Sequence, residues 1–249
     1  MQKKLFLLFF LSTCCAAFHA VGQDKEYLVG VEDVSYYPLF DFESENVNKP
    51  SFARDLLASF FEKNNYKYKF VALPVKRFDK WYIEHNIDFK FPDNFRWRED
   101  HTNKLGIHFS EPIIQLTAGT YVLKNNEAYT RNNVTRLATI RGFHPTLWLT
   151  EVRAGKLQIV EESSPVSVVK HVIAGNAEAT NIDKNVIRHS LQKLSSNEQL
   201  VLAENIYNQR YYYHFSSIRY PEVIEKFNVF LRDNQNLIQS LKKKYQIEE

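Results

Sequence analysis

Hydrophobic and polar positions follow two different periods along the first part of the chain. Residues 27–34 form a short run rich in β-branched side chains, which predicts a buried strand that ends before Pro38. Apolar positions at 52–61 then recur at helical spacing, with Ser51 available as a cap. Three further elements are predicted in this half: a strand at 66–73, a helix at 76–85 and a strand at 87–89. This succession indicates a parallel sheet covered by helices.

The same alternation restarts in the second half. Residues 90–106 are polar and aromatic without a clear period and predict an irregular connection, whereas 113–123 predict a strand long enough to cross between two bodies. The later predictions are strands at 137–140, 156–161 and 177–182, helices at 145–154 and 166–173, a second crossing strand at 211–216, and terminal helices at 221–245. The pattern therefore predicts two α/β units joined by two long strands.

The first residues have the layout of a secretory signal. Basic residues come first, an apolar run occupies 5–11, and small residues follow at Ala20 and Gly22. The run is shorter than the roughly 20 apolar residues that a membrane-spanning helix needs. We therefore expect residues 1–22 to be a signal peptide and the chain to be exported.

Cysteine usage depends on that prediction. Both cysteines, Cys14 and Cys15, lie inside the signal segment, so cleavage leaves no thiol for a disulfide, a metal site or a nucleophile. The alternative is a lipoprotein in which Cys14 becomes the lipidated N-terminus. Cleavage also removes two lysines and no acid, which reduces the formal charge of the 249-residue chain from +3 to +1. This balance excludes a nucleic-acid partner, which would require a strongly basic face.

Motifs for cofactor chemistry are absent from the sequence. Only 7 glycines occur, and neither glycine-rich phosphate-binding string is present. The eight histidines lack metal-ligand spacing, and no G-x-S-x-G string supports a serine nucleophile. We expect no cofactor and no metal.

An ordered series of short segments extends over essentially the whole mature chain. It comprises residues 29–31, 36–40, 52–57, 73–74, Arg77, Asp88, 109–112, 140–142, 174–179 and 221–223. In this series the chain resembles the family 3 extracellular solute-binding proteins, the periplasmic polar amino-acid-binding proteins of ABC importers. The resemblance implies an α/β, bilobed fold of the type 2 periplasmic-binding kind, in which two α/β lobes are joined by two hinge strands. Lobe 1 would comprise 25–116 plus 217–249, and lobe 2 would comprise 121–209.

The resemblance also implies a function. The protein would be a periplasmic monomer without catalytic activity that closes on a small polar ligand, an amino acid or a related amine or carboxylate. Its partner would be an ABC-transporter permease or a membrane sensor. One alternative is an enzyme on the same scaffold that dehydrates small acids, with Glu32, Glu111 or Glu178 as general acid or base. Another is a sensory binding protein without a transport role.

Several ligand-binding residues follow from the resemblance. Tyr36 matches the aromatic residue over the ligand, Asp33 a polar position on the same loop, and Asp183 the acid that faces the ligand amine. Arg141 lies in a matching segment, and Thr146 ends a stretch that we expect to open a helix with free backbone N–H groups for an anion. The alternatives are that Tyr36 covers the sheet edge and that Asp183 caps a helix.

The chain departs from the family pattern at residues 88–98. The hydroxyl residues and the threonine that usually precede the carboxylate-binding arginine are missing. Arg96 or Arg98 would supply the guanidinium that binds the ligand carboxylate. The alternative is that both arginines are solvated side chains on a loop. Lys90 and Asp93, together with Asn94, would replace the usual contacts, which suits a different polar or anionic ligand.

Overall fold

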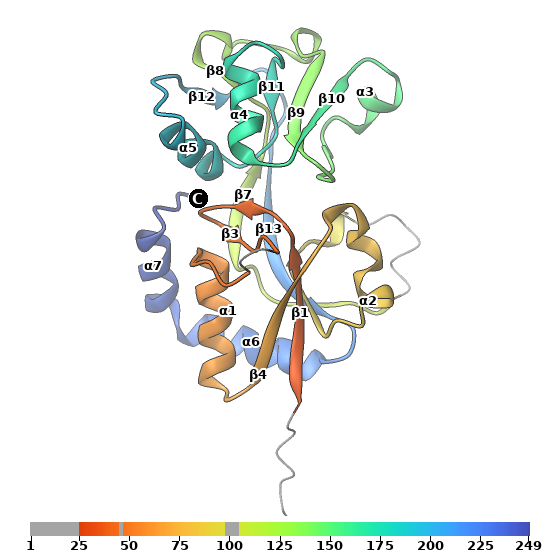
Figure 1. Ribbon diagram of the computed structural model, residues 1–249, viewed down its shortest axis with the longest axis vertical. Coiled ribbons are helices and arrows are strands. Elements are labelled where there is room, and N and C mark those ends of the chain that lie inside the picture. The colour runs from red at the N-terminus through yellow and green to blue at the C-terminus, as the bar shows by residue number, and fades with distance from the viewer. Residues whose placement is uncertain (1–24, 45–46, 98–104) are drawn as a thin grey trace, which may run out of the picture.

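The computed structural model describes residues 25–44, 47–97 and 105–249. The predicted signal peptide and Arg98 lie outside these residues. The described chain forms two α/β bodies, one above the other in Figure 1, each built on its own sheet. We call the body with the N-terminal strand lobe 1 and the other lobe 2. The predicted two-lobed α/β fold is confirmed.

Lobe 1 contains a six-stranded sheet. Five strands follow the order β4 (Lys67–Leu73), β1 (Glu26–Glu32), β5 (Phe89–Asp93), β13 (Gln209–Ser217) and β6 (His108–Phe109), and β7 (Ile114–Ala118) pairs with β13. β1 is parallel to β4 and β5, whereas β13 is antiparallel to β5. The central strand β1 is buried over most of its length, as its β-branched sequence predicts.

Helices cover this sheet and close its core. They are α1 (Phe52–Lys63), α6 (Pro221–Asp233) and α7 (Gln235–Lys244), with Pro221 in the first turn of α6. Phe60 of α1 packs edge-on against Phe227 of α6 at 4.9 Å between ring centroids. Phe89 of β5 stacks on Phe215 of β13 at 4.8 Å. Aromatic side chains therefore join the helices and the sheet into one core.

Lobe 2 contains a five-stranded sheet with its own helices. The strand order is β10 (Gln158–Glu162), β9 (Arg136–Ile140), β11 (Ala179–Thr180), β8 (Tyr121–Leu123) and β12 (Leu200–Leu202). Its helices are α3 (Leu149–Arg153), α4 (Pro165–Ile173) and α5 (Lys184–Lys193). Val168, Val169 and Val172 form the buried face of α4.

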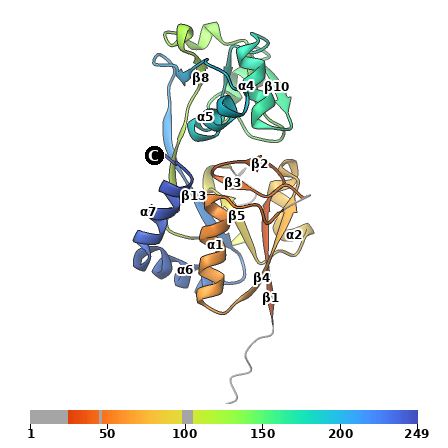
Figure 2. The same cartoon turned by 60° about the vertical axis from the view of Figure 1, so that its left-hand side comes forward.

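Two strands connect the lobes. β7 and β13 pair antiparallel from Ile114 opposite Tyr213 to Ala118 opposite Gln209, and they run together from lobe 1 towards lobe 2 (Figures 1 and 2). The predicted pair of hinge strands is confirmed. The first is shorter than predicted, because the chain breaks at Gly119 and Thr120 before it enters β8.

Short elements complete the described chain. They are strands β2 (Ser35–Tyr36) and β3 (Phe40–Asp41), helix α2 (Trp81–Glu84), and the 3₁₀ turns Val75–Lys80, Phe95–Trp97, Lys124–Asn126 and Arg131–Asn133. Within the described residues, no helix combines the length and apolar character needed to cross a membrane.

Two predictions about local structure are wrong. Residues 90–93 are not irregular but belong to β5. The hydrophobic pattern did not predict this strand, because Lys90 and Asp93 are charged residues that are fully buried. The predicted helix at 145–154 is reduced to the five-residue α3, and the chain from 142 to 148 is a series of turns. The predicted anion site at the start of that helix is therefore not formed.

Candidate functional site

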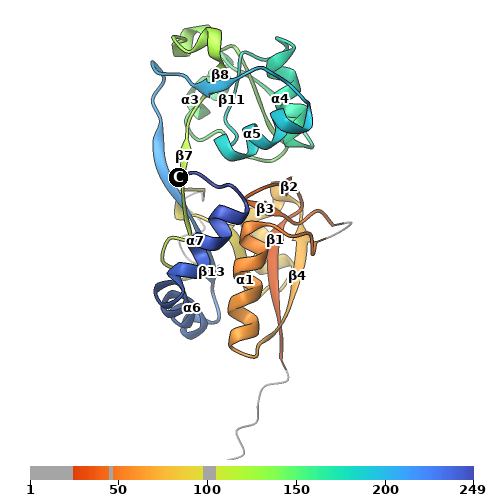
Figure 3. The same cartoon turned by 90° about the vertical axis from the view of Figure 1, so that its left-hand side faces the viewer.

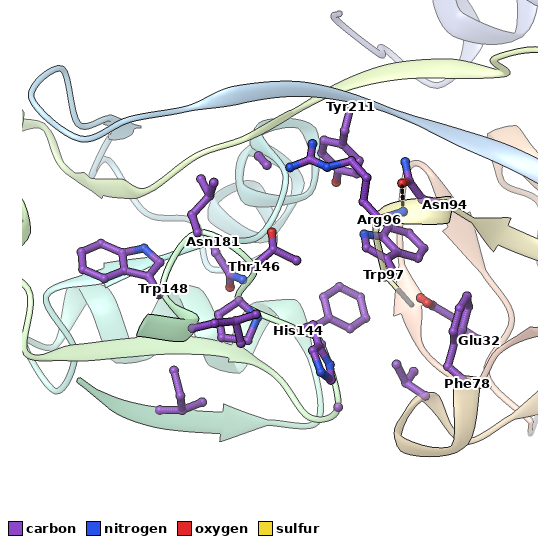
Figure 4. A pocket seen from close by; sticks show the side chains of 18 of the residues that line it. Glu32, Phe78, Asn94, Arg96, Trp97, His144, Thr146, Trp148, Asn181 and Tyr211 are labelled. Atoms are coloured by element: carbon purple, nitrogen blue, oxygen red, sulfur yellow. Dashed lines mark hydrogen bonds between the residues drawn. The ribbon is translucent and has the colours of Figure 1, made fainter. Parts of the chain in front are cut away.

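A pocket of about 590 Å³ lies between the two lobes. Lobe 1 contributes Glu32, Tyr36, Val75, Lys76, Phe78, Asn94, Arg96 and Trp97; the hinge contributes Ala118, Gly119, Tyr211 and Tyr213; lobe 2 contributes 142–149, Val152, Ile159, Glu161 and Asn181. Figure 4 shows Glu32 and Phe78 on one side of this pocket and Trp148 on the other. Its size is that of a site for a small organic ligand.

The end of β5 positions the polar part of the lobe 1 wall. Asn94 donates its side-chain amide to the Tyr212 carbonyl at 2.7 Å, and its side-chain oxygen accepts from the Arg96 backbone N–H at 2.9 Å. The Arg96 guanidinium donates to Gln209 of β13 at 2.6 Å. These bonds hold a guanidinium beside the hinge, where it can receive a carboxylate.

The 142–149 segment forms the lobe 2 wall. Trp148 is buried and donates its indole N–H to the Thr120 hydroxyl at 3.0 Å, while the Arg131 guanidinium lies 4.2 Å from the centre of a Trp148 ring. Several backbone N–H groups here are occupied: Gly142 donates to Glu161 at 3.0 Å, and Phe143 donates to the Ile140 carbonyl. This wall therefore offers aromatic faces and side-chain groups, not a helix N-terminus.

Two pocket-lining oxygens are buried without a hydrogen-bond partner among the described residues. One is Oε2 of Glu32 and the other is Oδ1 of Asn181. Burial raises the pKa of the Glu32 carboxyl to about 8, an effect that Lys90 opposes and Asp93 strengthens. Unsatisfied buried oxygens are costly, so these two atoms indicate where a ligand would bind.

Charged residues lie behind the Glu32 wall. Lys90 is fully buried, donates to the Phe78 carbonyl at 2.7 Å and lies 3.4 Å from the centre of the Phe78 ring. Asp93, also fully buried, accepts hydrogen bonds from the Asn94 backbone N–H and the Ser216 hydroxyl. Neither side chain lines the pocket. They are instead buried charges that act on Glu32 from β5.

The structure brings four of the sequence-predicted residues together around the pocket, namely Tyr36, Asn94, Arg96 and Thr146. Asp33 is exposed and accepts a 2.7 Å hydrogen bond from the Ser44 backbone N–H outside the pocket. Arg141 is exposed and does not line the pocket either.

Asp183 does not line the pocket. It is the N-cap of α5, and its Oδ1 accepts from both the backbone and the side chain of Asn185. The alternative interpretation of Asp183 as a helix cap is thus confirmed. Arg77 pairs with Glu84 at 2.5 Å on the surface.

Several pocket residues are not among the ligand-binding residues that the sequence predicts. Glu32 is predicted only as a general acid or base, although an acid at the end of a buried strand is a strong signal. Asn181 had no sequence signal, and Phe143 and Trp97 are not distinguished from ordinary core aromatics. The described residues contain no group of three or more potential metal ligands.

Direct contacts join the lobes beside the pocket. Tyr36 accepts a hydrogen bond from the Asp183 backbone N–H, and Lys76 pairs with Glu161 at 2.8 Å. Gly142 approaches lobe 1 so closely that a Cβ there would lie 2.9 Å from the Lys76 backbone nitrogen. The C-terminal residues also reach α5 of lobe 2, beside the hinge (Figure 3). The lobes are therefore in contact around the pocket.

Many solved structures share this two-lobed fold, and three of them represent different kinds of protein. The chain matches a mutant of ArgBP from T. maritima with a TM-score of 0.68 at 17% identity, over 90% of this chain and 96% of that one. The type 2 periplasmic-binding fold is therefore established. The fold is also that of a histidine kinase sensor domain (TM-score 0.69, 12% identity, 89% and 96% covered). A third structure is an ancestral amino acid-binding protein described as a precursor of cyclohexadienyl dehydratase (0.65, 19%, 88% and 95%).

The likeness to periplasmic-binding proteins is one of structure. No protein-family model matches the chain, and no curated protein has a significantly similar sequence. The sequence resemblance to family 3 solute-binding proteins is thus confirmed at the level of the fold that it implies.

Proposed function

We propose that this chain is a solute-binding protein that captures a small polar ligand between its lobes, without catalysis. The observation that carries the proposal is the interlobe pocket of about 590 Å³, to which both lobes and both hinge strands contribute. A ligand that contacts both lobes stabilises the closed arrangement by its differential affinity. ArgBP and the ancestral amino acid-binding protein share this fold and support the proposal.

The ligand in this proposal is an amino acid or a related amine or carboxylate. Arg96 would receive a carboxylate, Tyr36 would contact the ligand from lobe 1, and Thr146 would contact it from lobe 2.

The lobes would comprise residues 25–116 with 217–249, and 121–209. We further propose export by the signal peptide at 1–22 to the periplasm, where the closed protein, as a monomer, presents its ligand to an ABC importer.

The test is calorimetric titration and thermal-shift screening against amino acids, amines and small carboxylates. We expect R96A to weaken binding of any carboxylate ligand by at least about tenfold, since a charge-assisted pair is lost. R141A is the matched control, because Arg141 is exposed and lies outside the pocket. A folded protein that no compound in a broad panel stabilises would contradict the proposal.

A second candidate function is a cleft enzyme. Glu32 supports it, because a buried carboxyl whose pKa is raised to about 8 is protonated at neutral pH and is suited to general acid catalysis. Turnover of a small acid that E32Q abolishes would favour the enzyme over simple binding. The likeness to a sensor domain also leaves a sensory role as an alternative to import, and gene neighbourhood would distinguish the two.

A further inference from the structure

Glu32 is the carboxyl group that the pocket leaves available for a ligand. It ends β1, is 4% exposed, and its Oε2 has no hydrogen-bond partner among the described residues. Figure 4 shows its side chain at the pocket wall beside Phe78. An acid buried in this way needs a partner that the described residues do not provide.

The other acids near the pocket are either paired or do not line it. Glu161 accepts from Lys76 at 2.8 Å and from the Gly142 backbone N–H at 3.0 Å. Asp183 does not line the pocket: its Oδ1 accepts in the cap of α5, and its buried Oδ2 has no hydrogen-bond partner among the described residues. A cation that entered the pocket would therefore find its carboxylate on lobe 1.

The charges around Glu32 indicate that a ligand group beside it would be positively charged. The groups that act on it are Lys90, which favours the ionised carboxylate, and Asp93, which opposes it, both on β5. Two acids thus share one buried ammonium in this cluster. A proton on Glu32 balances the charge when the pocket is empty, and a cationic ligand group would balance it in the proton's place.

The rest of the pocket suits such a group. The remaining buried and unpartnered pocket oxygen, Oδ1 of Asn181, is also an acceptor. Tyr36 and Tyr213 line the pocket, and their phenols remain protonated because burial raises the pKa of both groups. Aromatic faces attract cations, so the surroundings of Glu32 favour a ligand nitrogen.

We propose that the Glu32 carboxylate receives a cationic nitrogen of the ligand and so determines the charge that the pocket accepts. The proposal rests on the proposed function and makes it more specific. The proton balance is simple: the protonated carboxyl and a ligand ammonium form an ion pair, and the carboxyl proton passes to the solvent. Arg96 donates to Gln209 through one nitrogen and has further N–H groups that can receive a carboxylate, so a zwitterion with a second nitrogen and a simple amine are both within this class.

The first experiment uses ligands in charge-matched pairs. The probes are L-arginine with L-citrulline, choline with 3,3-dimethyl-1-butanol, and putrescine with 1,4-butanediol, with L-glutamate and succinate as anions. We expect at least one cation to bind and its uncharged analogue to bind at least about tenfold more weakly. E32Q should remove this preference, whereas D33N, which changes the neighbouring exposed carboxylate outside the pocket, should retain it.

The second experiment measures protons. Calorimetry of the bound cation at pH 7 in two buffers of different ionisation enthalpy should show release of close to one proton per ligand, and E32Q should release almost none. Affinity for the cation should therefore rise as the pH increases towards 8. A structural role of Glu32 alone would not produce this proton release.

The outcomes separate the two proposals. Binding of anions or uncharged analogues that E32Q leaves unchanged would overturn the role of Glu32 while the solute-binding function stands. Cation binding that E32Q does not weaken would also overturn it, and cation binding without proton release would contradict the protonated state of Glu32 before binding. If no compound of this panel or of the broader one binds to the folded protein, the solute-binding function itself fails.

Discussion

The phenol oxygen of Tyr36 in lobe 1 accepts a 2.7 Å hydrogen bond from the backbone N–H of Asp183 in lobe 2. Both residues are almost completely buried, although 147 positions separate them in the chain. The bond lies next to the pocket, where Tyr36 also packs edge-on against Phe143. One side chain therefore contacts the pocket and the opposite lobe at the same time.

Removing this bond should weaken lobe closure. Y36F leaves the Asp183 N–H buried and unpaired when the lobes are in contact, which costs about 1–3 kcal/mol, whereas water can satisfy it when they separate. We expect a larger radius of gyration by solution X-ray scattering and a larger gain in compactness when ligand binds. Y207F is the control, because Tyr207 is 64% exposed. An unchanged scattering curve for Y36F would show that the bond does not contribute to closure.

Gly142 should limit how closely the lobes approach. Its φ of +90° and the 2.9 Å that would separate a Cβ from the Lys76 backbone nitrogen both exclude a side chain. G142A should therefore hold the lobes apart and weaken ligand binding by about 5- to 150-fold, the effect of an interlobe clash of about 1–3 kcal/mol. G155A tests the backbone strain alone, since Gly155 also has positive φ but a Cβ there meets nothing within 4 Å. Equal effects of the two substitutions on ligand affinity would contradict this explanation.

Stability should depend on pH through Glu32. Its pKa is about 8 in the folded protein against 4.5 for an ordinary glutamate, so the folded state binds more protons between these values. The free energy of unfolding should therefore fall as the pH rises from about 4.5 to 8, by an amount on the order of a few kcal/mol. Urea denaturation of the wild type and E32Q at pH 5 and pH 9 tests this expectation. At pH 9, E32Q should be more stable than the wild type. If the free energies of unfolding of the two proteins differ by the same amount at pH 5 and pH 9, the expectation is wrong.

The C-terminal residues should lose protection when their contacts with α5 are removed. Arg188 donates to Glu248 at 2.5 Å and to the Gln246 carbonyl, and Asn185 exchanges two hydrogen bonds with the Glu248 backbone. R188A should accelerate amide hydrogen exchange in the peptide that contains Glu248 and cost about 1 kcal/mol or less. K156A, an exposed change in lobe 2 away from this contact, should leave the exchange unchanged.

The general architecture could be read from the sequence because it depends on local periodicity. The run at 27–34 and the helical spacing at 52–61 each reflect burial of one face or one strand, and the structure contains β1 and α1 there. The two long strands between the α/β units also left a local signal in their β-branched and aromatic residues. Pro221 likewise began a helix, because its fixed φ suits the first turn.

The pocket could be predicted only in part. The predicted residues that line it are Tyr36, Asn94, Arg96 and Thr146. The charges of Lys90 and Asp93, in contrast, concealed a buried strand, because a sequence alone does not indicate that a charged side chain is buried in the folded protein.

The sequence by itself determined the succession of strands and helices, because side-chain periodicity along a single element is a local property. Tertiary structure alone decided that Glu32 and Asn181, from different lobes, border one pocket, and that Asp183 caps a helix beside Tyr36. The physical reason is that the lining of a pocket and the pairing of a backbone N–H depend on groups more than one hundred residues apart, which come together only when the lobes meet.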